Sequence, residues 1–414
     1  MAEPRPQIPY FKEFLPTPVC IVLSLFFAMV FQFNGGVFLP AATQMSSALG
    51  CIQEDVTMAG YASFIGMLMV VWICVMCLTR TIRLGKKIPL YGIDWIGLLL
   101  WTVMLFAIVF IGIYRDFYDW LDSVQIRSCI VIAVVSLLIN ISRMTSIRHP
   151  YIAPQVFRYK KFPVVLFLFL MLCLFLTTSS VLQNAFMTSI LQYDTLNAIS
   201  LNWCVFAGIL AGAGIVFFRQ AVLKKGYKLL ISFGFTLIVM YQYYMYFLIY
   251  PDLNIESLYL PNFLKGIGHG VLYISLTIYV AKHIPFKHFF QSLCVLSFIR
   301  TSIATPLGSA ILNRWMKHLQ RDNWGLLSRN MDNLHEWMPD VSLMQLYEEV
   351  NTQTMLTSLK ELFGWICLLG TVFLVIVLSY RIWRDRHLAA LKMLHSLPVK
   401  KRYRPSSIHK ISKN

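Results

Sequence analysis

The chain has 414 residues, of which 57% are hydrophobic and 13% are charged, and its formal net charge is +17. An average soluble domain carries about 25% charged residues, so this composition excludes an ordinary soluble protein. Basic loops beside the anionic lipid of an inner leaflet account for the positive charge without a nucleic acid partner. We therefore expect the lipid bilayer to be the main partner of this chain, and no nucleic acid.

Ten apolar stretches of membrane-spanning length recur along the chain, and we expect each to form a transmembrane helix. They cover residues 18–46, 56–79, 91–114, 125–143, 162–182, 196–218, 227–250, 257–281, 288–313 and 355–381. The first stretch has no A-x-A-like cleavage site close behind it, so we interpret it as a retained span rather than a signal peptide. The predicted fold is all-α: a polytopic membrane helix bundle.

Positive charge is distributed unevenly between the two sides of this topology. Of the 36 Lys and Arg residues, 27 fall in loops on one side and six in loops on the other, while Lys265, Arg300 and Lys360 lie within or at the ends of apolar stretches. The positive-inside rule then predicts a multi-pass protein of the cytoplasmic (inner) membrane with both termini in the cytoplasm. The segment 315–354 would lie outside, as a small cap or mobile loop.

The sequence contains no motif of a known enzyme class. It has no H-E-x-x-H, no Walker lysine motif and no G-x-S-x-G, and its histidines are dispersed. We therefore predict no catalytic residue, no metal site and no cofactor. Cys74 and Cys77 form a C-x-x-C, but no partner pair lies near them, and this pattern favours packing in the core over redox or metal chemistry.

Polar and ionisable residues within the apolar stretches are the best candidates for a substrate cavity. Arg300 lies deep in the ninth stretch and His269 lies in the eighth, flanked by glycines. Because charge in hydrocarbon is costly, such side chains normally face the protein interior or an aqueous cavity. Gln32 and Asn34 in the first stretch and Gln183, just after the fifth, are further polar candidates.

Two other ionisable residues lie nearer to the ends of their predicted helices. For Lys265 and Glu361, snorkelling to the interface or capping of a helix end competes with a functional role. Glu361 is nevertheless the acid nearest to bilayer depth in the second half of the chain, and it is our candidate for proton coupling. The glycines of the eighth stretch, and Gly208 with Gly212 in the sixth, favour close helix packing.

Several loose motifs share an order and spacing over nearly 300 residues. They are I-D-W-I-G at Ile93–Gly97, D-F-Y-D-W-L-D at Asp116–Asp122, H-P-Y-I-A-P-Q-V-F-R-Y-K-K-F at His149–Phe162, L-S-F-I-R-T at Leu296–Thr301 and K-E-L-F-G-W at Lys360–Trp365. Because its motifs occur in this order and spacing, the chain resembles the later part of the fourteen-helix drug:proton antiporters of the major facilitator superfamily, the EmrB/QacA type.

The resemblance implies a domain organisation in four parts. Residues 1–87 would be an N-terminal remnant with two helices, 88–161 two linker helices with a basic cytoplasmic link, 162–381 a complete C-terminal six-helix half, and 382–414 a basic cytoplasmic tail. The family has six helices before its linker helices, so about four would be missing here, with the junction near Met67–Trp72. A facilitator works by rocking two six-helix halves around a central site, and one half would be mostly absent.

Three functional interpretations follow. The first is a transmembrane transporter of the major facilitator type that moves small amphipathic compounds or drugs outward. The second is a non-transporting remnant or scaffold that is inactive unless it forms a homodimer. The third is a polytopic membrane enzyme, which would need a catalytic acid or His at the membrane face. We expect the chain not to be an enzyme.

Overall fold

The protein is described here from a computed structural model, which covers residues 39–62, 94–147, 150–159, 161–193, 197–223, 227–329 and 342–396. These residues form helices and no strands. The prediction of an all-α fold is therefore confirmed for the part of the chain that the structure describes.

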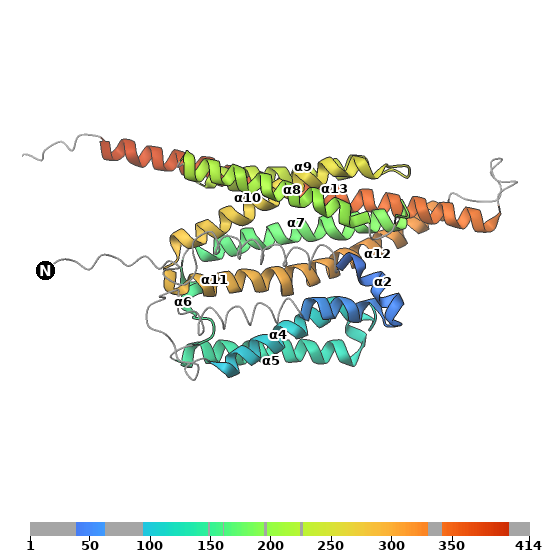
Figure 1. Cartoon of the computed structure of the whole chain (residues 1–414), viewed down its shortest axis with the longest axis horizontal. Helices are drawn as coiled ribbons and strands as arrows, with labels where there is room; N and C mark the ends of the chain where they lie inside the picture. The colour runs from blue at the N-terminus through green and yellow to red at the C-terminus, as the bar shows by residue number, and fades with distance from the viewer. Residues whose placement is uncertain are drawn as a thin grey trace, which may run out of the picture.

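Long apolar helices make up most of the molecule, and in Figure 1 they lie roughly along its longest axis. The elements are α2 (Leu39–Leu49), α4 (Trp95–Tyr114), α5 (Val124–Ser146), α6 (Gln155–Arg158), α7 (Phe162–Ser189), α8 (Asn197–Phe217), α9 (Lys228–Leu248), α10 (Tyr259–His283), α11 (Phe286–Phe298), α12 (Thr305–Arg329) and α13 (Leu343–Ser396), with the short 3₁₀ segments η4 (Trp120–Asp122) and η6 (Ile255–Leu258) and the π-helical segments η5 (Phe218–Val222) and η7 (Ile299–Ala304).

Eight helices in the described residues are long and apolar enough to cross a membrane. They correspond to the third to tenth predicted stretches, so a multi-pass membrane protein is supported. Of the first two stretches, the structure describes only residues 39–46 and 56–62, both of them helical. The rest of these stretches, including Gln32 and Asn34, lies outside the described residues, as do the predicted junction at Met67–Trp72 and Cys74 and Cys77.

The last long helices extend beyond the boundaries expected from the sequence. The ninth was predicted to end at residue 313, but α12 continues to Arg329, and α13 begins at Leu343 rather than at 355. Much of the predicted outer loop 315–354 is therefore helical. The reason is visible in the packing, because Leu319 and Val350 are buried and continue the apolar stripes of the two helices past the hydrocarbon-length segments.

The helix of the tenth predicted stretch also continues beyond residue 381. α13 is helical to Ser396 and so includes the first residues of the basic tail that we predicted from residue 382. Its last part is rich in Ala, Leu and basic residues, whose intrinsic helix propensity is high and does not depend on packing against a neighbouring helix.

Glycines set the closest helix contacts, which join α10 to α8 and α9. A Cβ atom on Gly208 of α8 would lie 2.3 Å from the backbone oxygen of Phe263, and one on Gly266 of α10 would lie 2.3 Å from that of Val205. Gly268, two residues further along α10, faces α9 instead, where a Cβ would lie 2.8 Å from Ile238 Cγ1. The glycines therefore let α10 pack tightly between two neighbours, as small residues do in membrane helices.

The α4–α5 hairpin is closed by an ion pair at one end. Asp94 caps the start of α4 by accepting a hydrogen bond from the backbone N–H of Gly97, at 2.9 Å. The same carboxylate oxygen accepts a second hydrogen bond, at 2.6 Å, from the Arg143 guanidinium near the end of α5. One buried carboxylate thus satisfies an unpaired helix N–H and also fixes the two helices to each other.

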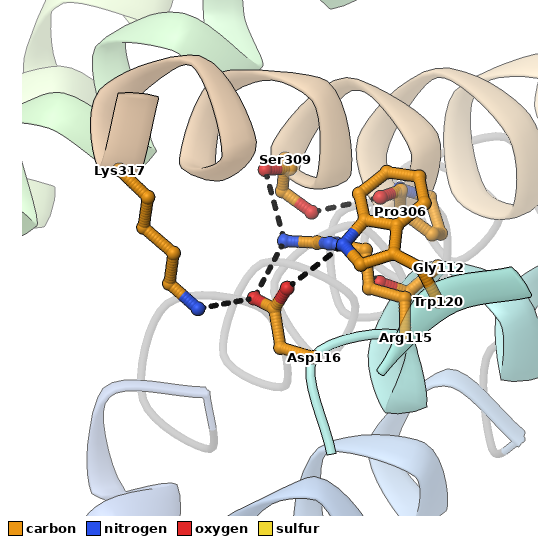
Figure 2. A network of polar contacts seen from close by, with 7 residues as sticks. All are labelled: Gly112, Arg115, Asp116, Trp120, Pro306, Ser309 and Lys317. Atoms are coloured by element: carbon orange, nitrogen blue, oxygen red, sulfur yellow. Dashed lines mark hydrogen bonds and ion pairs between the residues drawn. The ribbon is translucent and has the colours of Figure 1, made fainter. Parts of the chain in front are cut away.

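Arg115 joins the other end of α4 to α12, as Figure 2 shows. The Arg115 guanidinium is buried and donates hydrogen bonds to the backbone oxygens of Gly112, at 2.5 Å, and Ser309, at 3.3 Å. Its charge pairs with Asp116 at 3.4 Å, and Lys317 of α12 approaches the same carboxylate at 3.3 Å. Burial lowers the pKa of Arg115, and the Asp116 carboxylate opposes that shift.

The backbones of α4 and α12 meet closely beside this network. A Cβ on Gly112 would lie 2.5 Å from the Cβ of Pro306, so no larger residue fits there without a shift of the helices. The Trp120 side chain covers the network: its indole N–H donates to Asp116 at 3.3 Å, and the Arg314 guanidinium lies 4.5 Å from the centre of a Trp120 ring. The α4–α5 hairpin is therefore a packed part of the bundle.

Candidate functional site

The candidate site begins with a stripe of polar residues on one face of α10. Lys265, His269 and Tyr273 follow each other at intervals of four residues, which places them on the same side of a helix, one turn apart. The glycines of α10 face α8 and α9. The polar stripe therefore lies on a different face of the helix. Sequence analysis picked out His269 alone and treated Lys265 as a residue near a helix end.

Lys265 lies over an aromatic ring inside the bundle. Its ammonium nitrogen is 5.0 Å from the centre of the Tyr241 ring of α9, and Tyr241 is fully buried. A cation at this distance from a ring face makes a cation–π interaction.

The Tyr241 hydroxyl group extends the polar chain to α7. It donates a hydrogen bond to Gln183 Oε1 at 2.7 Å, and both side chains are buried. The Gln183 amide nitrogen in turn lies 4.0 Å from the Met187 sulfur. Gln183, predicted as a polar cavity candidate, is thus connected through Tyr241 to Lys265.

Arg300 reaches the same stripe from another helix. It belongs to η7, where the helix that contains α11 and α12 widens to a π-helical turn between them. Such turns are rare, and they occur frequently at functional sites. The Arg300 guanidinium lies 5.5 Å from the centre of the Tyr273 ring, and the His269 ring meets the same ring edge-on at 6.1 Å.

These contacts bring two of the predicted candidates, His269 and Arg300, into one group with Lys265. We use the name "basic cluster" for Lys265, His269 and Arg300 together with the rings of Tyr241 and Tyr273. His269 lies within electrostatic reach of both Arg300 and Lys265. Gln183 adjoins the cluster through its hydrogen bond to Tyr241.

Glu361, the candidate for proton coupling, lies at a different contact. Its side chain is exposed on α13, and its carboxylate accepts a hydrogen bond at 3.3 Å from the amide of Asn323 on α12. The same amide donates at 3.0 Å to the hydroxyl of Ser358. No contact in the described residues joins Glu361 to the basic cluster. The other two candidates, Gln32 and Asn34, lie outside the described residues.

A cavity lies near the start of α7 and the end of α10. Its volume is about 230 Å³, and its lining includes Tyr159, Lys161, Tyr279 and His283. His283 stacks on Tyr279 with ring centres 4.2 Å apart. None of the predicted site residues lines this cavity. Among the residues that the structure describes, no group of three His, Cys, Asp or Glu side chains is placed to hold a metal ion.

The sequence contained a signal for the part of the site that was missed. The spacing of Lys265, His269 and Tyr273 by four identifies a common helix face without any structure. Tyr241 carried no such signal, because its role depends on how α9 packs against α7 and α10.

Comparison with known proteins leaves the family open. Neither a scan against protein-family models nor a search of curated proteins gives a match to this chain.

Proposed function

We propose that this chain is a membrane transport protein of the facilitator type, which moves small amphipathic compounds across the cytoplasmic membrane. The observation that carries the proposal is the basic cluster, in which Lys265 of α10 and Arg300 of η7 lie over the rings of Tyr241 and Tyr273 within apolar helices. Keeping charge at such a position is costly, and in membrane proteins it typically marks a substrate or ion pathway.

The arrangement of the helices is consistent with this function. Ligand sites of helix bundles form between facing helices, and here residues of α7, α9, α10 and η7 converge. The resemblance to the fourteen-helix antiporters gives the same expectation for the type of transport, and it implies that α7 to α13 are the C-terminal half of such a protein.

Proton coupling through Glu361 is not part of the proposal. Coupling requires an ionisable group whose protonation changes as substrate binds within the membrane. Glu361 is exposed and hydrogen-bonded to Asn323 at the contact of α12 with α13. We therefore propose transport that follows the gradient of the substrate.

The direct test is transport by the whole chain in proteoliposomes. Fluorescent amphipathic dyes of either charge would be loaded, and their efflux and the internal pH would be followed together. We expect protein-dependent efflux of at least one dye without a pH change, lost in Arg300→Gln and retained in Arg321→Gln, whose side chain is exposed on α12. Glu361→Gln should behave as the unmodified protein.

A second candidate function is a non-transporting scaffold, which the isolation of Glu361 from the cluster favours. Absence of efflux from folded protein for every dye would overturn the transport proposal and support this alternative. A substrate-dependent pH change that disappears in Glu361→Gln would instead show proton coupling and contradict the uncoupled mechanism.

A further inference from the structure

The cavity between the start of α7 and the end of α10 lies at the boundary of the apolar region. Its lining comes from residues around Phe162, where one membrane-length helix begins, and around His283, where another ends. Tyrosines and basic residues are enriched at this level of membrane proteins, where they meet the lipid head groups. We use the name "interfacial cavity" for this space, whose lining includes Tyr159, Lys161, Tyr279 and His283.

The interfacial cavity carries positive charge without a negative partner. Lys161 lines it and takes part in none of the ion pairs found in the described residues. The lining side chains that the structure describes include no Asp or Glu. An anion that enters the cavity would therefore meet the Lys161 ammonium and accept a charge-assisted hydrogen bond from it.

His283, the second basic residue of the lining, is fixed in its orientation by two tyrosines. Its Nδ1–H donates to the backbone oxygen of Tyr279 at 2.8 Å, because a carbonyl oxygen can only accept. The His283 ring stacks on the Tyr279 ring, with centres 4.2 Å apart, and meets the Tyr227 ring edge-on at 6.1 Å. The polar atom that remains for a ligand is Nε2, which accepts from a hydroxyl when the ring is neutral and donates to a phosphate when it is charged.

The size of the interfacial cavity suits a head group better than a whole amphipathic compound. Its volume is about 230 Å³, whereas pockets for drug-sized ligands measure about 300–1,000 Å³. Acyl chains would stay outside, and α7 offers them a surface. Val164 follows Lys161 by three residues and so lies on the same side of the helix. Val164 and Phe167, three residues further on, are about half exposed, at 54% and 50%.

We infer that the interfacial cavity binds the phosphate head group of an anionic phospholipid, with phosphatidylglycerol as the ligand of matching chemistry. Lys161 pairs with the phosphate, His283 contacts the phosphate or a glycerol hydroxyl, and the acyl chains lie along Val164 and Phe167. Basic pockets between membrane helices are known to take such head groups. The inference goes beyond the proposed transport and does not depend on it, because a lipid site of this kind serves a transporter and a scaffold alike.

The test measures which lipid stays bound to the full chain. The protein would be placed in nanodiscs that hold equal amounts of phosphatidylglycerol and phosphatidylcholine with the same acyl chains, and then released for native mass spectrometry. We expect one phosphatidylglycerol to be retained, at an apparent affinity at least about tenfold higher than that of phosphatidylcholine, since a hydrogen bond to a charged group is worth that much.

Lys161→Gln should weaken the retention of phosphatidylglycerol by about tenfold, and Lys161→Arg, which keeps the charge, should retain most of it. His283→Phe keeps a ring to stack on Tyr279 but removes both nitrogens, and it should also weaken retention. The matched control is Lys282→Gln, which removes a positive charge at the same end of α10, where Lys282 is exposed and faces the Tyr227 ring at 5.9 Å. If a variant fails to fold, the preference of the unmodified protein between the two lipids still tests the inference.

A soluble head group identifies the source of the phosphate. Glycerophosphoglycerol, which has the head group without acyl chains, should not displace the lipid at the same concentration, because it gains nothing from the exposed face of α7. Displacement would assign the cavity to a soluble phosphate compound and overturn the lipid.

Two other outcomes would also overturn the inference: equal retention of both lipids, and equal loss of phosphatidylglycerol in Lys161→Gln and Lys282→Gln. The second outcome would mean that general positive charge at this end of the bundle attracts the lipid. Dye efflux is measured separately, so absence of efflux with selective lipid retention would overturn transport alone, and efflux without selective retention would overturn the lipid site alone.

Discussion

Gly208 and Gly266 determine how closely α8 and α10 approach each other. A Cβ on Gly208 would lie 2.3 Å from a backbone oxygen and 2.9 Å from the Cα of Gly266, and backbone atoms cannot move aside as a flexible side chain can. The crossing in turn fixes the position of α10, which carries Lys265 and His269. Two residues that have no side chain therefore control the geometry of the candidate site.

We predict that Gly208→Ala destabilises the protein by about 1–3 kcal/mol, the usual cost of overpacking. The control is Gly214→Ala on the same helix, where a Cβ would meet nothing within 4 Å. That change should be neutral or slightly stabilising, because alanine favours helix over glycine. Thermal unfolding of the two variants in detergent, followed by circular dichroism, measures the difference. Equal midpoints would show that the helices can separate without cost.

At the scale of the elements, Arg115 holds the α4–α5 hairpin to α12. The guanidinium is 4% exposed, and it connects the backbone oxygen of Gly112 to that of Ser309, nearly 200 residues further along the chain. Other side chains of the network, such as Lys317, are largely exposed and screened by solvent. We therefore expect the buried arginine to contribute most of the stability of this junction.

Arg115→Met should lower the free energy of unfolding by roughly 2 kcal/mol, because charged hydrogen bonds to buried acceptors are lost while the apolar stem is kept. Lys317→Met should cost less than about 1 kcal/mol. Hydrogen exchange followed by mass spectrometry would locate the effect, with faster exchange expected in α4 for Arg115→Met. Arg127→Met, on the exposed start of α5, is the control. Unchanged exchange in α4 would mean that the Gly112–Pro306 contact alone holds the hairpin.

Sequence periodicity predicted the spans well and their ends poorly. The core of each span from α4 to α13 was visible, because long apolar runs leave little choice in a membrane. The extensions of α12 to Arg329 and of α13 back to Leu343 were missed, since beyond the hydrocarbon region helices are held by packing between them, as of Leu319 and Val350. For the site, Arg300, His269 and Gln183 were predictable as costly or polar groups at depth, whereas the partner ring of Tyr241 depends on the tertiary arrangement.

At the scale of the whole molecule, the alternating direction of the helices places basic loops at the same end of the bundle. With α11, η7 and α12 taken as one helix, successive long helices from α4 to α13 run in opposite directions in Figure 1. One end of the bundle therefore holds Arg158 of α6, Lys228 at the start of α9 and Lys282 at the end of α10, while the other holds Asp116 and Asp252. Among the residues that the structure describes, these basic and these acidic side chains thus lie at opposite ends of one bundle.

The last prediction concerns the orientation of this bundle in the membrane. The basic end should face the cytoplasm, because translocation of Lys and Arg is disfavoured and anionic lipid attracts them. In a variant without its nine native cysteines, single cysteines at the exposed positions Asp252 and Arg321 should react with a membrane-impermeant maleimide added to intact cells. Cysteines at the exposed positions Lys228 and Lys282 should react only after the membrane is opened. Labelling of Lys228→Cys in sealed cells would contradict this orientation and show that the basic end of the bundle faces outward.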